Sequence, residues 1–429
     1  MAKTKVIIKL NDYKIKTDFI NLTILMSFVT LFLVQTFNIS SVIYFLIDIP
    51  IVVMFWQNKS RIINACLSKP VFLITITLLV IFGFMLIGGI VNSVPLGNII
   101  YGIYKYYRGF IFFYCTLALC DDNSIEHTYG FIKLSFAINV VLSIIEFFLF
   151  GINQDLLGGI FGTIIGVNQY TNLYFVIISV YCIEKILNRD VENKKNYKQI
   201  ITMSIMMLAI AALAEIKYFF AEFLILFLIA YICLPKKLKS VIGMGVVLLS
   251  IVICYNILLQ IFPEFSDLVR QLKLGGMVRL ADLQRHYSTD YDIGRAVVFS
   301  YSNKNLLPAK INQIFGMGIG NVTSSNMVNN SFWIKNQLTH YDQFYTSYLY
   351  NEQGIIGFIL YCLVFFEILL IGIKAVFQRN KRKYGTMLVM LVCGCIMIFA
   401  YNMALYSQLC FIAFWALAVL VKKCTQVEV

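Results

Sequence analysis

The sequence has few charged residues, too few to form the polar surface of a soluble protein. Only 13% of its 429 residues are Asp, Glu, Lys or Arg, whereas soluble domains contain about a quarter. Hydrophobic residues make up 60% of the chain, too many to bury inside one globule of 49.2 kDa. These values exclude a soluble enzyme, a disordered chain and a secreted disulfide scaffold, and they indicate a polytopic membrane protein.

Cysteine is absent from the one long polar stretch, residues 261–350. The eleven cysteines lie in or beside apolar segments, where a free thiol behaves as a small hydrophobic group. Cys393 and Cys395 are close in sequence, but no His or acid accompanies them, and a zinc site needs four clustered ligands. We therefore expect no metal site and no cofactor.

Long apolar runs dominate the rest of the chain. A helix needs about 20 apolar residues to cross a bilayer, which predicts an all-α bundle of about twelve transmembrane helices. The predicted spans are residues 19–37, 40–56, 71–92, 99–120, 128–150, 170–187, 200–216, 217–234, 239–260, 353–374, 385–401 and 402–421. The seventh and eighth spans, and the last two, follow each other closely enough to predict tight helical hairpins. The first span follows a basic stretch without a cleavage signal and is interpreted as an anchor.

Basic residues are missing from the short loops 93–98 and 151–169, and this absence sets the orientation. With the N-terminus in the cytoplasm, 23 of the 35 basic residues fall on cytoplasmic segments. Both termini are then cytoplasmic. The predicted organisation is nine spans in 1–260, one large external loop in 261–352 with short amphipathic helices, and three spans in 353–429. The net charge of +13 is thus an orientation signal rather than a nucleic-acid site.

Four basic residues, Lys105, Arg108, Lys133 and Lys217, break this pattern because they fall in or at the ends of spans. Lys133 lies near the cytoplasmic end of its span, where a lysine can extend its ammonium group to the membrane surface. Lys105 and Arg108 share one helix face with Tyr101 and Tyr104, and Arg108 lies on the order of 13 Å below the external surface. Lys217 lies at the external end of its span. A buried cation normally has a partner or faces a cavity. Internal ion pairing and binding of a lipid phosphate or diphosphate both remain open. The acids within spans that could neutralise these bases are Asp48, Glu146 and Glu222, and Lys217 lies beside Glu215 in the sequence.

The external loop holds two of the three histidines. Arg279 and His286 project from one face of a predicted helix over 277–287, which also contains Arg285, and His340 precedes Asp342. A histidine is a common general base near neutral pH. The glycine run Phe315-Gly-Met-Gly-Ile-Gly320 lacks the strand–helix–strand unit of a dinucleotide site, so it predicts a close backbone turn instead.

Four motifs, taken in order, resemble the bacterial O-antigen polymerase and O-antigen ligase superfamily of GT-C membrane glycosyltransferases. They are Gly162-Thr163 to Asn168-Gln169, Lys217 where the family often has Ser-Arg, Gly294-Arg295 followed by Phe315–Gly320, and His340 followed by Glu352-Gln353-Gly354-Ile355-Ile356-Gly357. The match covers roughly 95–375. Two departures are that Lys217 replaces the usual Arg and that His340 lies about three residues farther from Gly354. The family role of the histidine could therefore fall on His340, Asp342 or Gln343.

The resemblance implies inverting glycosyl transfer from an undecaprenyl-diphosphate-linked glycan to a sugar hydroxyl, without a nucleotide sugar or metal. It implies a catalytic base at His340 or Asp342 and a catalytic Arg295 that stabilises the departing charge. The implied diphosphate-binding residues are Lys105, Arg108, Lys217, Arg279 and Arg285. The implied glycan-binding residues are Tyr101, Tyr104, His286 and Tyr345.

We therefore interpret the sequence as a repeat-unit polymerase of O-antigen, capsule or lipopolysaccharide type in the bacterial inner membrane, with its active site facing outward. Its expected partners are the lipid-linked oligosaccharide, the bilayer, and possible flippase and chain-length regulator proteins, with no nucleic acid. A ligase to another acceptor is the near alternative. A transporter or flippase of the same lipid is the rival from another class, but the chain lacks the two related halves typical of transporters. A non-catalytic assembly protein would not need Arg108 at membrane depth.

Overall fold

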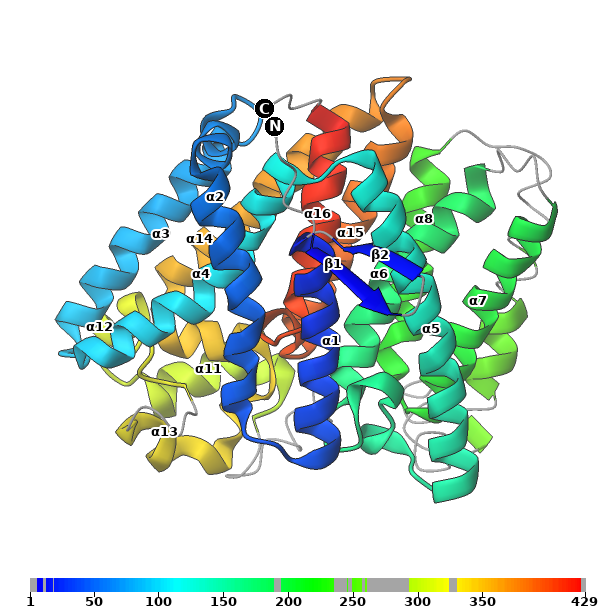
Figure 1. The fold of residues 1–429 in the computed structure, drawn as a ribbon. Helices are drawn as coiled ribbons and strands as arrows, with labels where there is room; N and C mark the ends of the chain where they lie inside the picture. Colours follow the sequence, from blue (N-terminus) through cyan, green and yellow to red (C-terminus); the bar gives the residue numbers. More distant parts are fainter. Residues whose placement is uncertain are drawn as a thin grey trace.

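The structure is a computed structural model that describes residues 6–10, 13–17, 19–188, 194–234, 245, 249–256, 259–260, 293–323 and 330–425. These residues form a bundle of long helices with several short helices at one end (Figure 1). The chain is a helical membrane protein: among the described residues, seven helices are long and apolar enough to cross a bilayer.

The helices agree closely with the predicted spans. The long ones are α1 (Phe19–Phe37), α2 (Asp48–Leu67), α3 (Phe72–Val91), α4 (Leu96–Leu119), α5 (Asp122–Phe150), α6 (Asn168–Asn188), α7 (Lys194–Leu213), α8 (Lys217–Cys233), α14 (Tyr345–Val376), α15 (Arg382–Tyr401) and α16 (Cys410–Thr425). Half of the predicted span 239–260 lies outside the described residues, and its described residues, 249–256 among them, are helical. Each of the other eleven predicted spans overlaps one of these helices.

Short elements connect and cap the bundle. They are the 3-10 helices η1 (Ser41–Ile47), η2 (Gln154–Leu156), η3 (Gly159–Phe161), η4 (Arg295–Val297), η6 (Gln337–Thr339), η7 (Tyr341–Gln343) and η8 (Ala404–Tyr406), the π-helical turn η5 (Ser302–Leu306), and the short helices α11 (Val298–Tyr301), α12 (Lys310–Phe315) and α13 (Ser331–Asn336). The described part of the external loop thus contains several short helices joined by turns. Its predicted helices at 263–273 and 277–287 lie outside the described residues.

One prediction needs correction, because the regular structure is not entirely helical. Strands β1 (Val6–Leu10) and β2 (Tyr13–Thr17) form an antiparallel hairpin that pairs Val6 with Thr17. Valine, isoleucine, tyrosine and threonine at these positions favour strands over helix. The hairpin precedes the bundle and leaves the helical character of the remainder unchanged.

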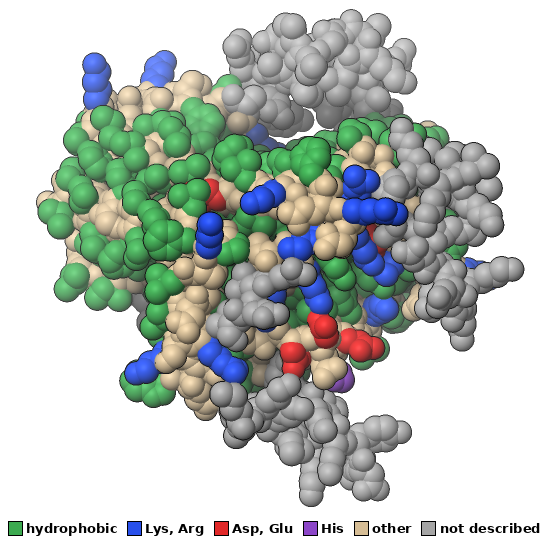
Figure 2. All heavy atoms as spheres, turned by 90° about the horizontal axis from the view of Figure 1, so that it is seen from above, with side chains coloured by type: hydrophobic (Ala, Val, Ile, Leu, Met, Phe, Trp, Pro, Cys, Tyr) green, Lys and Arg blue, Asp and Glu red, His purple; other side chains and the backbone are tan. Residues whose placement is uncertain are grey.

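Large apolar side chains point outward along the bundle. Leu79, Ile90 and Phe148 are each at least 65% exposed although they lie on helices that are otherwise packed. Figure 2 looks onto the end of the bundle where α16 terminates and shows hydrophobic side chains across much of the outer flank. Such a surface is incompatible with water and fits the hydrocarbon of a membrane.

Helix α16 is the centre of the bundle. Every residue from Cys410 to Val421 is buried. Gly109 of α4 allows close approach, since a Cβ there would lie 2.5 Å from the ring of Phe414, and Phe110 packs against the same ring with centroids 4.9 Å apart. A helix that is apolar on all sides is expected to be enclosed by its neighbours, here α4, α14 and α15.

The two predicted hairpins have different outcomes. Helix α7 ends at Leu213 and α8 begins at Lys217, with Glu215 in the left-handed conformation, so this tight hairpin is confirmed. Helices α15 and α16 are not joined by a tight turn, because residues 402–409 separate the end of α15 from the start of α16. The Asn402 side chain accepts the amide of Ala404 at 2.9 Å, and the Ser407 hydroxyl accepts that of Leu409 at 3.2 Å. Such local bonds compete with helix formation.

Candidate functional site

The segment 401–408 lies where α4, α14, α15 and α16 meet, at the end of the bundle that carries α11, α12 and α13 (Figure 1). The backbone amide of Tyr345 donates to the carbonyl of Asn402 at 3.2 Å, which ties the start of α14 to this segment. Three of its side chains, Tyr401, Tyr406 and Gln408, contact the cations singled out by sequence. We call residues 401–408 the hub segment.

Arg108 is buried and already has partners. One terminal nitrogen lies 3.1 Å from a carboxylate oxygen of Asp48, and the other donates to the side-chain oxygen of Gln408 at 2.7 Å. The guanidinium also lies 4.8 Å from the ring centroid of Phe411. Of the two alternatives left open by the sequence, internal ion pairing describes Arg108, and its predicted diphosphate contact does not fit this arrangement.

Lys105 differs from Arg108 although it lies one helical turn away. Its ammonium group lies 4.7 Å from the ring centroid of Tyr406 and 5.4 Å from that of Tyr101. It forms no ion pair or hydrogen bond with any residue that the structure describes. Lys105 lies about 14 Å along the helix axis from the first residue of α4. It is therefore a cation held by aromatic rings, at membrane depth, without a carboxylate in contact.

A polar network links the hub segment to α14. The Tyr406 hydroxyl lies 2.8 Å from that of Tyr348, and Tyr348 donates to a carboxylate oxygen of Glu352 at 2.9 Å. The same oxygen accepts the backbone amide of Gly320 at 2.8 Å. Glu352 is buried, and its charge attracts Lys105 across this network without touching it.

Sequence reasoning did not assign a role to Glu352 or Tyr406. Glu352 entered only as part of the motif that leads into α14. A carboxylate placed directly before a long apolar run, two residues from Gly354, is the signal that could have identified a buried acid there. Tyr406 offered no comparable signal among 26 tyrosines.

The backbone of the glycine run between Phe315 and Asn321 lies in close contact with the backbone of neighbouring helices. Gly316, Gly318 and Gly320 all have positive φ, and an added Cβ at Gly320 would lie 1.9 Å from the carbonyl oxygen of Asn98 on α4. An added Cβ at Gly102 would lie 2.6 Å from the Gly320 nitrogen. The prediction of a close backbone turn is confirmed: the run lets the loop pass between α4 and the kink of α14.

The kink itself is at Gly354, whose φ of 63° and ψ of −167° interrupt α14. The amides of Met317 and Gly318 donate to the carbonyls of Asn351 and Glu352 at 2.9 and 3.0 Å. Those carbonyls lie just before the break, where the helix cannot supply their usual donors. The loop therefore completes the helix and fixes Glu352 in place.

Arg295 lies at the edge of the hub segment and is exposed. Its Nε donates to the Tyr401 carbonyl at 3.1 Å, and its guanidinium carbon lies 4.2 Å from the Tyr401 ring centroid. The opposite face of the stack is formed by Tyr218, whose ring lies 4.4 Å from that of Tyr401 at an interplanar angle of 14°. The terminal nitrogens of Arg295 have no carboxylate partner within the described part of the chain. The stack and the Nε hydrogen bond hold this guanidinium in one orientation, and its planar fork of terminal N–H groups is of the kind that binds anions.

Lys217 begins α8 beside this stack. Its ammonium lies 2.6 Å from a carboxylate oxygen of Glu215, and the pair is partly exposed. The structure thus brings Lys217 and Arg295 to the same end of the bundle, but Lys217 already has an acid partner. Its contribution to an anion site would require that pair to open.

His340 and Asp342 lie on the turn between η6 and η7. His340 is exposed and adopts the left-handed conformation, with φ of 50°. The indole nitrogen of Trp333 donates to one oxygen of Asp342 at 3.2 Å. The turn is anchored by Tyr341, whose hydroxyl donates to the Val322 carbonyl at 2.6 Å. Burial, followed by the nearby charges of Asp342 and Glu352, raises the pKa of the Tyr341 phenol, so it stays neutral and serves as a structural donor.

The predicted glycan-binding tyrosines occupy three different environments. Tyr101 is half-buried and contacts Lys105. Tyr104 donates its hydroxyl to Asp48 and stacks on Phe45 with centroids 5.6 Å apart. Tyr345 is 3% exposed and enclosed by aromatic side chains, so stacking on a sugar does not fit its position. Arg279, Arg285 and His286 lie outside the described residues.

The space beside the cations is small. A cavity of about 10 Å³ is enclosed by Lys105, Arg108, Tyr345, Tyr361 and Tyr406 among others. A volume of this order holds about one water molecule. Across the residues that are described, no three His, Cys, Asp or Glu side chains are grouped to hold a metal ion.

Comparison with known proteins gives no relative from which a role could be taken over. No protein-family model matches the chain, and no curated protein matches it either. The site is therefore described by its own residues: a partly buried lysine held by aromatic rings, an exposed stacked arginine, and a buried glutamate that ties the loop to the hub segment.

Proposed function

We propose that this protein is a polysaccharide repeat-unit polymerase of the O-antigen type, a GT-C glycosyltransferase that uses an undecaprenyl-diphosphate-linked donor. The observation that supports it best is the pair of cations at the hub segment, Lys105 and Arg295. Each contacts an aromatic ring of that segment, and neither has a carboxylate partner within the described ranges. Cations without acids beside them favour an anionic ligand.

In the proposed reaction the anomeric carbon of the donor glycan loses its bond to the diphosphate oxygen. The hydroxyl oxygen of the acceptor sugar attacks that carbon from the opposite face and forms the new glycosidic bond. Its proton passes to a base on the turn between η6 and η7, either His340 or Asp342. Arg295 and Lys105 stabilise the negative charge that develops on the leaving undecaprenyl diphosphate.

The proposed topology places the hub segment toward the outside of a bacterial inner membrane. The end of the bundle where α16 terminates carries Lys422 and Lys423 and would face the cytoplasm, as basic residues prefer. Both chain termini would lie on that side, and the number of spans would be about twelve. The lipid-linked donor would enter from the bilayer, and a flippase and a chain-length regulator would act on the same glycan.

The decisive experiment supplies the purified protein with a lipid-diphosphate oligosaccharide as both donor and acceptor. A ladder of products on a gel is expected. A single addition to a different acceptor would instead identify a ligase, and movement of intact lipid across a vesicle without a new bond would identify a transporter.

The cation pair is tested by Lys105→Gln and Arg295→Gln in the same assay. Removal of one group that stabilises transition-state charge costs about 100-fold or more in rate. Lys335→Gln serves as the matched control, since Lys335 is an exposed lysine on α13 at the same end of the bundle. Wild-type product ladders from both Gln variants would contradict the proposed site.

A further inference from the structure

A second polar cavity lies at the opposite end of the bundle, between α5, α6, α15 and α16. It has a volume of about 480 Å³ and is lined by four lysines, one from each helix: Lys133, Lys185, Lys383 and Lys423. Figure 2 shows Lys and Arg side chains gathered near the centre of this end. The cavity shares no lining residue with the cavity beside the hub segment.

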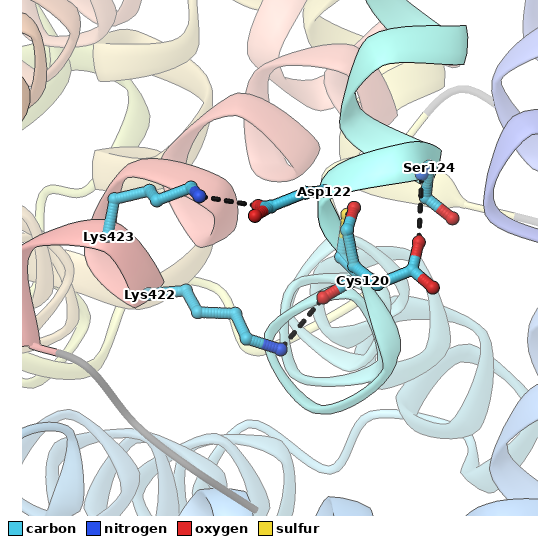
Figure 3. Close-up of polar contacts among 6 residues, drawn as sticks. Cys120, Asp122, Ser124, Lys422 and Lys423 are labelled. Atoms are coloured by element: carbon cyan, nitrogen blue, oxygen red, sulfur yellow. Dashed lines mark hydrogen bonds and ion pairs between the residues drawn. The ribbon is translucent and has the colours of Figure 1, made fainter.

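Two of the lysines are neutralised by acids of the protein. Lys423 lies 2.5 Å from an oxygen of Asp122 at the start of α5 (Figure 3), and Lys383 lies 3.5 Å from an oxygen of buried Glu184. Lys422 points away from the cavity and donates to the Cys120 carbonyl at 2.8 Å. These contacts hold the end of α16 and the start of α15 against their neighbours.

The other two lysines, Lys133 and Lys185, lie beside an aromatic ring, and the side chain of Lys185 also interacts with that of Lys383. The ammonium groups of Lys133 and Lys185 lie 5.5 and 5.9 Å from the ring centroid of Tyr181. Neither forms an ion pair within the described part of the molecule, although Glu126 also lines the cavity and Glu184 acts on Lys185 electrostatically. The cavity has four lysines and three acids and therefore a positive excess.

An apolar groove continues from this cavity along the side of the bundle. It lies between α5 and α7, has a volume of about 440 Å³, and is lined by apolar side chains that include Phe136, Val140 and Met206. Lys133 lines both the groove and the lysine cavity. A cationic pocket and an apolar groove that meet at one lysine match a ligand with an anionic head and a hydrocarbon tail.

We propose that this pair of cavities binds an anionic phospholipid. Its phosphate lies among Lys133, Lys185 and Lys383, and an acyl chain follows the groove past Phe136 and Met206. A lysine at the end of a span naturally holds its ammonium group at headgroup level, with its methylene stem against apolar surface. Basic pockets between transmembrane helices favour anionic over zwitterionic headgroups. The lipid would join α5 to α6, α7 and α15 and is independent of the proposed glycosyl transfer.

The test uses full-length protein stripped of lipid in detergent and titrated with phosphatidylglycerol, phosphatidylcholine or glycerol 3-phosphate. Native mass spectrometry reports the bound lipid, and thermal unfolding reports its effect. Wild type is expected to retain phosphatidylglycerol in preference to the other two. Lys133→Gln/Lys185→Gln should weaken this binding about 25-fold, since each lysine near an anionic lipid contributes about fivefold.

Two further variants test whether binding depends on the cavity volume and whether loss of any exposed lysine has the same effect. An added Cβ at Gly130, on the cavity wall, would meet nothing within 4 Å, so Gly130→Leu should fill the cavity without disturbing the helix and also displace the lipid. Lys374→Gln is the matched control, because Lys374 is an exposed lysine at the same end that lines neither cavity.

Equal retention of phosphatidylglycerol and phosphatidylcholine would overturn the proposal. So would unchanged binding in both Lys133→Gln/Lys185→Gln and Gly130→Leu. If glycerol 3-phosphate binds as tightly as phosphatidylglycerol, the ligand is a soluble phosphate compound. That result would also overturn the proposed phospholipid site.

Discussion

At the scale of single residues, burial and contacts distinguish basic residues for which the sequence predicts the same role. Lys105 and Arg108 share a helix face, and both were predicted to bind diphosphate. The structure pairs Arg108 with Asp48 and Gln408, while the contacts of Lys105 among the described residues are with aromatic rings. The sequence could name Asp48 as a possible partner, but only the packing of α2 on α4 could decide which base it neutralises.

Arg108→Gln is expected to destabilise the protein more than Lys105→Gln. Breaking a buried ion pair leaves an uncompensated charge and costs about 3 kcal/mol, whereas Lys105 has no ion pair to lose. Thermal unfolding in detergent measures the difference. Arg108→Gln/Asp48→Asn should recover much of the loss, because no charge is then left alone. Equal melting temperatures for Arg108→Gln and wild type would refute a structural role for the pair.

At the scale of elements, the glycine run shows what a sequence pattern can and cannot reveal. The spacing of Gly316, Gly318 and Gly320 predicts a tight turn because only glycine accepts positive φ readily. Its location against α4 depends on contacts between residues as far apart in the chain as Asn98 and Gly320, which no local pattern encodes. The α15–α16 connection failed as a predicted hairpin for a related reason: Asn402 and Ser407 bond to nearby backbone amides.

Gly320→Ala is expected to loosen the loop from the bundle. The new Cβ would lie 1.9 Å from the Asn98 carbonyl, and alanine at a φ of 75° costs about 1 kcal/mol or more before the clash is counted. Limited proteolysis should cut the segment 293–352 faster than in wild type, and thermal stability should fall.

The matched control is Gly97→Ala in the first turn of α4, where an added Cβ meets nothing within 4 Å. Alanine is the better helix former, so this variant should be neutral or slightly stabilising. If Gly320→Ala resists protease as well as the Gly97→Ala control does, the close contact of the glycine run with α4 does not hold the loop.

At the scale of the whole molecule, composition and periodicity were sufficient to predict a helical membrane protein with helices near the observed bounds. Apolar runs must form helices in lipid because each backbone amide needs a partner within its own segment. The central position of α16 could not be predicted, since its apolar residues resemble those of helices that face lipid. The polar network around Glu352 and the lysine cavity likewise arise from packing between distant segments, which no local pattern encodes.

The orientation of the molecule in the membrane is the prediction on which the proposed lipid-diphosphate donor depends. Of the 35 basic residues, 23 fall on segments assigned to the cytoplasm, and this bias should fix the α16 terminus inside the cell. Lys374→Cys should then react with a membrane-impermeant maleimide only after the cells are permeabilised, and Lys335→Cys should react in intact cells. The parent protein sets the background from its native cysteines. The reverse pattern would place the hub segment at the cytoplasmic face, where a donor of the proposed kind could not be used at the outer surface, while the lysine cavity would meet the opposite leaflet and could still bind an anionic lipid there.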